Sequence, residues 1–179
     1  VHQPFGDFVG AWKDMEKAVR MGKVRALGIS NFDANDEVWN TIMDSATIKP
    51  AVLQMECHPY AQRLEMRKKA AAAGIQVECW FPLGGAMSNG ALLKDPVIKK
   101  IAEAHGKSPA QIILRWHIQE GFSVIPGATN PDYIKENIQI FDFALSDEEM
   151  QQMRSLNKEQ RFFNMPEEGV RRMVRENRL

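Results

Sequence analysis

The sequence carries no excess of charge and little cysteine. Its 23 Lys and Arg residues balance 23 Asp and Glu residues, so the formal net charge is +0 at pH 7. Because nucleic acids and anionic membranes attract basic surfaces, this balance argues against both as partners. Two cysteines in 179 residues are too few to staple a small secreted fold, and we therefore expect a reducing, cytoplasmic location.

Long apolar runs and Gly-rich dinucleotide motifs are also missing. No run approaches the roughly 18 apolar residues of a membrane span, and we expect neither a transmembrane helix nor a signal peptide. No strand-like segment is followed by G-x-G-x-x-G, which argues against a Rossmann fold. Cys57, His58 and Cys79 invite a metal interpretation, but the other histidines are scattered along the chain, so no metal site is predicted.

Short apolar segments alternate with longer amphipathic ones. Apolar, β-branched runs bounded by Gly, Pro or Asn predict strands at 24–29, 51–57, 75–80 and 123–125. Helical spacing and capping signals predict helices at 12–22, 62–73, 96–105, 110–120 and 146–156. Such alternation is typical of βαβ units and predicts an α/β fold with a parallel sheet.

The spacing of the predicted strands fits a barrel. The first three recur about every 25 residues, and a (β/α)8 TIM barrel of about 250 residues averages ~31 residues per unit. An open, doubly wound sheet fits the same spacing. On the barrel interpretation, 179 residues hold about five of the eight βα units, so the barrel here is incomplete.

Ligand sites in parallel α/β folds lie at the C-terminal ends of the strands. Ser30 and Asn31 follow the first predicted strand, and they either bind a planar amide or cap the next helix. Gln54 lies inside an apolar strand, where a buried amide needs a partner or a ligand. Trp80 ends the third strand and either stacks on a flat ring or packs in the core.

The loop after the fourth predicted strand is a second candidate site. Gly127 allows a ligand to approach the backbone closely, Asn130 is suited to cap a helix, and Pro131 suits a first helical turn. Free amides at a helix N-terminus favour a phosphate. An ordinary strand-to-helix turn fits this sequence equally well.

Several motifs, in the same order, resemble those of the aldo-keto reductase family. They span nearly the whole chain: 12–16 (WKDME), 22–32 (GKVRALGISNF), 54–59 (QMECHP), 81–84 (FPLG), 107–116 (KSPAQIILRW) and 125–137 (IPGATNPDYIKEN). The resemblance implies a TIM barrel and NAD(P)H-dependent reduction of a small-molecule aldehyde or ketone to an alcohol.

The resemblance also implies site residues. His2 resembles the catalytic histidine that orients the substrate carbonyl, and Ser30, Asn31 and Gln54 resemble the groups that hold the nicotinamide carboxamide. Trp80 replaces the tyrosine that usually stacks on the nicotinamide ring. The cofactor contacts implied beyond the nicotinamide are Leu83, Gly84, Pro126, Gly127, Ala128, Thr129, Glu136 and Asn137.

The choice between NADPH and NADH depends on a departure from the family pattern. Many NADP-using members bind the 2′-phosphate through a Lys-Ser pair and a later Arg, where this sequence has Gly127, Ala128 and Tyr133. Either NADH is tolerated or preferred, or the helix N-terminus and the Thr129 hydroxyl hold the phosphate instead. We expect weakened discrimination, since each lost charge-assisted contact is worth ~1.5–3 kcal/mol.

The family's catalytic Tyr, Lys and Asp lie on early barrel strands that this sequence does not match. We therefore interpret residues 1–179 as the C-terminal portion of one barrel domain, with Val1 and His2 ending its fourth strand and a solvated segment at 158–179. We expect these residues alone to be inactive, because a missing general acid typically costs roughly 10²–10⁴ in rate. Phe162 and Phe163 either line a substrate pocket or anchor a loop in the core.

A non-catalytic half-barrel is the alternative interpretation. Such a module binds a nucleotide or another chain instead of catalysing a reaction. About five parallel strands do not close a barrel, so the sheet edges would be open to pairing. Self-association or an N-terminal half would then cover them.

Overall fold

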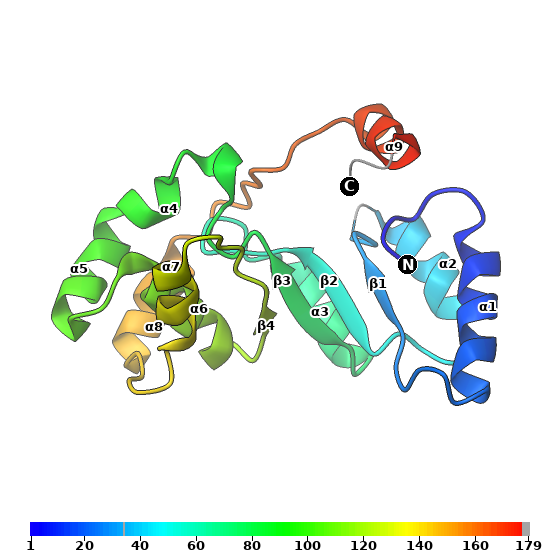
Figure 1. Cartoon of the computed structure of the whole chain (residues 1–179), viewed down its shortest axis with the longest axis horizontal. Helices are drawn as coiled ribbons and strands as arrows, with labels where there is room; N and C mark the ends of the chain where they lie inside the picture. Colours follow the sequence, from blue (N-terminus) through cyan, green and yellow to red (C-terminus); the bar gives the residue numbers. More distant parts are fainter. Residues whose placement is uncertain (34, 177–179) are drawn as a thin grey trace.

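The computed structural model describes residues 1–33 and 35–176. Within them, four parallel strands form one sheet in chain order: β1 (Gly28–Ser30), β2 (Val52–Glu56), β3 (Gln76–Trp80) and β4 (Ser123–Val124). The helices are α1 (Phe8–Arg20), α2 (Asp36–Ser45), α3 (Leu64–Ala72), the 3₁₀ turn η1 (Ala86–Ser88), α4 (Ala91–Lys94), α5 (Pro96–His105), α6 (Pro109–Gln119), α7 (Pro131–Ile138), α8 (Asp147–Ser155) and α9 (Glu167–Arg175). Helices separate successive strands, as Figure 1 shows, and the predicted α/β fold with a parallel sheet is confirmed.

Helix ends follow the signals in the sequence. Ser108 and Ser146 each form a capping box, with Gln111 and Glu149 respectively. Gly74 follows α3 with φ +68°, the left-handed conformation that glycine adopts at low cost. These local interactions explain why α3, α6 and α8 lie close to their predicted ranges. No helix among the described residues is long and apolar enough to cross a membrane.

The first strand is shorter than predicted. Residues 24–27 do not belong to β1, and Val24 is 41% exposed. Hydrogen bonding to the β2 segment begins where the Ala51 amide donates to the Leu27 carbonyl at 2.8 Å. The predicted strand therefore begins too early, because among the described residues this ladder starts only at Leu27.

Val1 extends the hydrogen bonding of the sheet beyond β1. Its terminal ammonium donates to the Gly28 carbonyl at 2.7 Å, and the Ser30 amide donates to the Val1 carbonyl at 2.8 Å. This alternation is the pattern of a parallel ladder and agrees with the expectation that Val1 ends a strand. It brings His2 to the same edge of the sheet as the C-terminal ends of β1 to β3.

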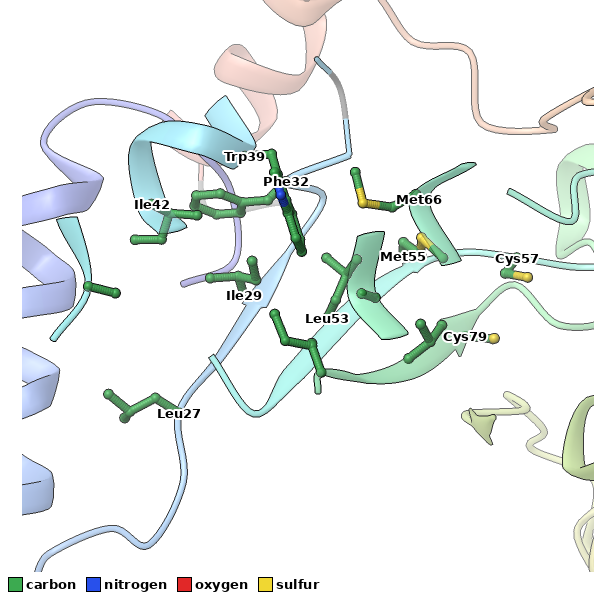
Figure 2. Packing of buried hydrophobic residues seen from close by; sticks show 14 of the residues in the cluster. Leu27, Ile29, Phe32, Trp39, Ile42, Leu53, Met55, Cys57, Met66 and Cys79 are labelled. Atoms are coloured by element: carbon green, nitrogen blue, oxygen red, sulfur yellow. The ribbon is translucent and has the colours of Figure 1, made fainter. Parts of the chain in front are cut away.

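One face of the sheet packs against α1, α2 and α3. The strand register places Ile29, Leu53 and Val77 side by side, and all three are buried. Figure 2 shows Phe32 and Trp39 packed over this row. Full burial of such side chains contributes roughly 1.5–3 kcal/mol each. Because side chains alternate along a strand, the residues between them face the opposite side of the sheet.

The C-terminal segment is not uniformly solvated, so that expectation is wrong for part of it. After α8 the chain crosses from the α5–α8 side of the molecule to the side of α1 and α2, where α9 lies (Figure 1). Val170 of α9 is buried, and the Arg171 guanidinium lies 4.2 Å from the ring centroid of Phe5. Residues 177–179 of the predicted segment lie outside the described residues.

Candidate active site

A cavity of about 790 Å³ lies at the C-terminal edge of the sheet, where the sequence places the ligand site. The loop before α1, the ends of β1 to β3, α2 and the C-terminal segment all contribute to its walls. The predicted site residues that line it are His2, Ser30, Asn31, Gln54 and Trp80. The structure thus brings together the groups predicted to contact the carbonyl and the nicotinamide.

Asn31 connects three of these groups. Its φ of +62° places it in the left-handed region, which asparagine tolerates better than most residues. Its Nδ2 donates to the His2 carbonyl at 3.2 Å and to Ser30 Oγ at 3.1 Å. Its Oδ1 accepts a hydrogen bond from Trp80 Nε1 at 3.1 Å. The side-chain amide is therefore fixed from both ends by the pocket itself.

The helix-capping alternative for Ser30 and Asn31 is wrong. Asn35 is the N-cap of α2, and its side chain accepts a hydrogen bond from the Val38 amide at 2.9 Å. Asn31 is unsuited to that role because its side chain is already bonded to Trp80 across the pocket.

Ser30 and Gln54 together offer the complement of a primary amide. Gln54 Nε2 donates to Glu78 Oε1 at 2.7 Å, so this mid-strand amide has a partner. Its Oε1 and the hydroxyl hydrogen of Ser30 have no partner within residues 1–33 and 35–176. One acceptor and one donor match the N–H₂ and C=O of a carboxamide. The residues present therefore fit a nicotinamide group.

Trp80 lies in an aromatic wall of the pocket. Its ring centroid is 4.8 Å from that of Phe81 and 5.7 Å from that of Phe163, both edge to face. A second core lies among α4, α5, α6 and α8 and contains Leu92, Ile112 and Trp116. Phe163 lines the cavity, whereas Phe162 packs against this second core and lies 4.7 Å from the His58 ring. Phe162 is thus anchored in a core, whereas a substrate contact of Phe163 in the cavity stays a prediction.

Buried Glu56 anchors the C-terminal wall. Its Oε1 accepts hydrogen bonds from the amides of Phe162 at 2.7 Å and Phe163 at 3.2 Å, and lies 3.2 Å from His58 Nε2. Its Oε2 accepts from Arg161 Nε at 2.8 Å. Burial raises the pKa of Glu56, but the hydrogen bonds from His58, Arg161 and Phe162 outweigh it and leave the pKa below its usual value. The carboxylate therefore stays charged and holds the segment over the pocket.

The predicted phosphate loop lies outside this cavity. Gly127 and Thr129 are exposed, and no described atom lies within 4 Å of a Cβ built at Gly127. Asn130 caps α7 as predicted, because its side chain accepts a hydrogen bond from the Asp132 amide at 2.9 Å. The Asp132 carboxylate adds negative charge at the helix N-terminus, which disfavours a second anion there. Binding roles for Pro126, Ala128 and the rest of the loop stay predictions.

The remaining predicted cofactor contacts have structural partners. Gly84 has φ +86° in the turn after β3, and a Cβ there would lie 2.8 Å from a neighbouring side chain. Leu83 packs against the second core. The Glu136 carboxylate accepts a hydrogen bond from Ser108 Oγ and so ties α7 to α6. None of these, nor Asn137, is among the described residues that line the cavity, and their cofactor roles stay predictions.

Neither tyrosine is placed to donate a proton in the pocket. Tyr60 donates to Asp95 Oδ2 at 2.6 Å, and burial followed by this hydrogen bond raises its pKa to about 12. Tyr133 is 60% exposed on α7. Among the described residues, the cavity therefore lacks the family's tyrosine acid.

Three potential metal ligands cluster outside the pocket: the sequence drew attention to Cys57 and Cys79, and the structure places His117 beside them. The ligand atoms of Cys57, Cys79 and His117 lie within 4.8 Å of one another, and all three residues are buried. Both imidazole nitrogens of His117 already face main-chain carbonyls, of Ile113 at 2.8 Å and of Cys57 at 3.1 Å. Burial lowers the pKa of His117 to about 4, although the hydrogen bonds to these two carbonyls raise it. The contacts of His117 indicate packing, as the sequence suggested.

Comparison with known proteins agrees with this geometry. Residues 1–158 match the Aldo/keto reductase family. The chain belongs to the aldo/keto reductase family. Aldo-keto reductase family 1 member A1 from Bos taurus is 45% identical over 157 residues, which cover 84% of this chain and 48% of that protein. Morphine 6-dehydrogenase from Pseudomonas putida is 43% identical over 171 residues, covering 88% and 56%. The chain spans about half the length of these curated relatives.

Solved structures of family members give the same picture. Gox0644 in its apo form superposes with a TM-score of 0.81 at 36% identity, covering 88% of this chain and 57% of that one. A mutant of Gox0644 in complex with NADPH gives 0.81 at 35% identity, covering 94% and 58%. MGS-M4, an aldo-keto reductase from a deep-sea metagenome library, gives 0.83 at 31% identity, covering 93% and 62%. The parallel α/β sheet therefore matches more than half of the length of each of these three family structures.

Two carboxylates important to the pocket had no assigned role in the sequence interpretation. The predicted strands at 51–57 and 75–80 contain Glu56 and Glu78, which lie in β2 and β3, but the contacts of their carboxylates do not follow from the strand prediction. A charged residue in an otherwise apolar strand is the signal that could have found them, because a buried carboxylate requires hydrogen-bond donors. The identity of those donors, on distant segments, is not readable from local sequence.

Proposed function

We propose that this chain is part of an NAD(P)H-dependent oxidoreductase that reduces aldehydes or ketones to alcohols, with the strand-end pocket holding the nicotinamide. The observation that carries the proposal is the meeting of His2, Ser30, Asn31, Gln54 and Trp80 in one cavity. Family membership supports it, and so does the NADPH complex of a protein that is 35% identical.

The side chains divide the work of binding. Ser30 donates to the carboxamide oxygen of the nicotinamide, and Gln54 accepts from its nitrogen. Trp80 offers a ring face for stacking, and base–aromatic stacking is worth about 1–3 kcal/mol. His2 is exposed at the rim and orients the substrate carbonyl. The bound cofactor supplies the hydride that reduces the carbonyl carbon.

Proton donation to the substrate needs an acidic group in addition to the side chains that line this pocket. Since neither Tyr60 nor Tyr133 lines the pocket, we expect the 179 residues alone to bind cofactor without turnover. We also expect weak preference for NADPH over NADH, because Gly127 and Tyr133 lack cationic side chains and Asp132 is anionic. Two buried cysteines without a disulfide are compatible with a cytoplasmic protein.

Fluorescence titration tests the proposal. Addition of NADH or NADPH should quench tryptophan emission, with the two dissociation constants within a hundredfold of each other. Trp80→Ala should weaken both, whereas Tyr133→Ala, on the exposed face of α7, should leave NADH binding unchanged. Absence of nicotinamide nucleotide binding would contradict the proposed function. Rapid NADPH oxidation with an aldehyde would contradict the expected inactivity of this chain.

A further inference from the structure

A row of polar side chains crosses the whole sheet. The strand register pairs Ser30 with Gln54, Gln54 with Glu78, and Glu78 with Ser123, so one polar residue comes from each of the four strands. Residues paired in register project to the same face. This row therefore lies on the face opposite the core row of Ile29, and Glu78 is its charged member.

Glu78 links the row through both of its oxygens. Gln54 Nε2 donates to Oε1 at 2.7 Å, and Ser123 Oγ donates to Oε2 at 3.2 Å. In both contacts Glu78 is the acceptor, and a carboxylate accepts hydrogen bonds and donates none. Gln54 lines the cavity, whereas Glu78 is not among its described lining residues.

We infer that Glu78 is a positioning residue that fixes the amide orientation of Gln54 and thereby makes the pocket select a carboxamide over a carboxylate on the pyridine ring of the ligand. This inference rests on the proposed function, since it concerns the same nicotinamide site. Glu78 acts through Gln54 and does not touch the ligand.

The selection follows from the two ends of the Gln54 amide. A glutamine amide is nearly symmetric in shape, so its nitrogen and oxygen exchange places by a half-turn unless a neighbour distinguishes them. The Glu78 carboxylate only accepts hydrogen bonds, so it keeps Gln54 Nε2 on its own side and leaves Gln54 Oε1 facing the ligand. That oxygen accepts from a carboxamide N–H₂, but it repels the oxygen of a nicotinic acid carboxylate.

Glu78→Gln removes this control without changing the length of the side chain. A glutamine at position 78 both donates and accepts, so Gln54 can present either its oxygen or its nitrogen to the ligand. Affinity for the carboxamide ligand should fall, and affinity for the carboxylate ligand should rise. If Glu78 had only a structural role, Glu78→Gln would lower the affinity for both ligands by the same factor.

A double-mutant cycle with two ligands tests the inference. The probes are NAD⁺ and its nicotinic acid analogue, with dissociation constants measured by calorimetry on the 179-residue protein. Wild type should favour NAD⁺ by at least about tenfold, the value of one mismatched hydrogen bond. Glu78→Gln should shift this ratio at least tenfold toward the analogue. Loss of the negative charge alone also favours an anion, so the same substitution is made in a Gln54→Leu background, where the shift should stay below threefold.

Ser123→Ala is the matched control, because it removes the other hydrogen bond of Glu78 and preserves its charge and its contact with Gln54. Its ligand ratio should equal that of wild type. Equal shifts for Glu78→Gln in both backgrounds, or no shift in either, would overturn the inference while leaving nicotinamide binding intact. Failure of wild type to bind NAD⁺ would instead contradict the proposed function. Thermal unfolding of each variant verifies that the protein titrated is folded.

Discussion

The strand-end cluster (His2, Ser30, Asn31, Gln54 and Trp80) and the phosphate loop (126–130) are both predicted to hold the same cofactor, yet they are built differently. In the cluster, side chains of three strands are tied by hydrogen bonds of 2.7 to 3.2 Å to one another, to Glu78 and to the backbone. In the loop, Gly127 and Thr129 are exposed, and no loop residue is among the described lining residues of the cavity.

The strand-end cluster is ordered before a ligand binds, whereas the phosphate loop would have to be ordered by binding. Strand register and the bond from Trp80 to Asn31 fix the cluster before a ligand arrives, so little conformational freedom is lost when one binds. The loop has few such constraints among the described residues, and the Asp132 carboxylate lies in the first turn of the helix that follows it. Nicotinamide recognition should therefore resist loop mutations, whereas NADPH preference should respond to them.

The largest expected effect comes from removing the anchor of the strand-end pocket. Glu56→Ala leaves Arg161 and two backbone amides without their buried acceptor, and it should lower the free energy of unfolding by about 3–5 kcal/mol. Urea denaturation measures this. Glu65→Ala is the control: its pair with Lys68 is exposed and screened by solvent, so its loss should change the free energy of unfolding far less. Equal losses in the two variants would contradict the anchoring role.

The next effect concerns the buried support of β2. His117 is fully buried, and its pKa is lowered from 6.5 to about 4, mainly by burial. A lowered folded-state pKa contributes stability that is complete above pH 6.5 and is lost as the pH falls toward about 4. The loss should reach about 3 kcal/mol, measured as the difference in pH dependence of unfolding between wild type and His117→Gln. If the free energy of unfolding has the same pH dependence in both proteins, the pKa of His117 is not lowered by folding.

Cofactor preference should change when cations are restored to the loop. Gly127→Lys combined with Tyr133→Arg should tighten NADPH about 10- to 100-fold and change NADH by less than threefold. The open space at Gly127 and the 60% exposure of Tyr133 accommodate both side chains.

Titration of both nucleotides provides the measurement. Met21→Lys with Val24→Arg adds the same charges at exposed positions near the end of α1 and controls for net charge. Equal tightening in this control, or no tightening in the loop variant, would contradict a phosphate site at the loop.

The smallest effect is expected from the stacking residue. Trp80→Ala should weaken NADH about tenfold, within the usual range of base–aromatic stacking, and it also removes the hydrogen bond to Asn31. Trp80→Tyr retains an aromatic face and should stay within threefold of wild type. Fluorescence of bound NADH measures both. Equal weakening by the two substitutions would indicate that the indole N–H matters and the ring face does not.

Local sequence predicted the elements whose causes are local. The capping boxes at Ser108 and Ser146, the turn at Gly74 and the alternation of β2 and β3 are written in adjacent residues. Strand-end position and the resemblance together also predicted the strand-end cluster. The fold of the C-terminal segment was not predictable in the same way, because α9 has a polar composition and the residues before it are held by Glu56, far earlier in the chain.

The role of Ser30 and Asn31 illustrates the same limit. Short polar residues after a strand suit a helix cap as well as a ligand contact. The actual N-cap of α2, Asn35, has the same side-chain chemistry. The Asn31 side chain instead accepts a hydrogen bond from Trp80, which lies at the end of β3. Long-range pairing thus decides between two roles that are locally equivalent.

The central claim, that the strand-end cluster holds the nicotinamide, is tested most directly by NMR titration with half-ligands. Reduced nicotinamide mononucleotide should shift the backbone amide resonances of Ser30, Asn31, Gln54 and Trp80 and leave those of the phosphate loop unchanged. Adenosine 2′,5′-bisphosphate should leave the cluster unchanged. Nicotinamide mononucleotide that shifts the loop resonances, or that leaves the cluster unmoved at saturating concentration, would contradict the account.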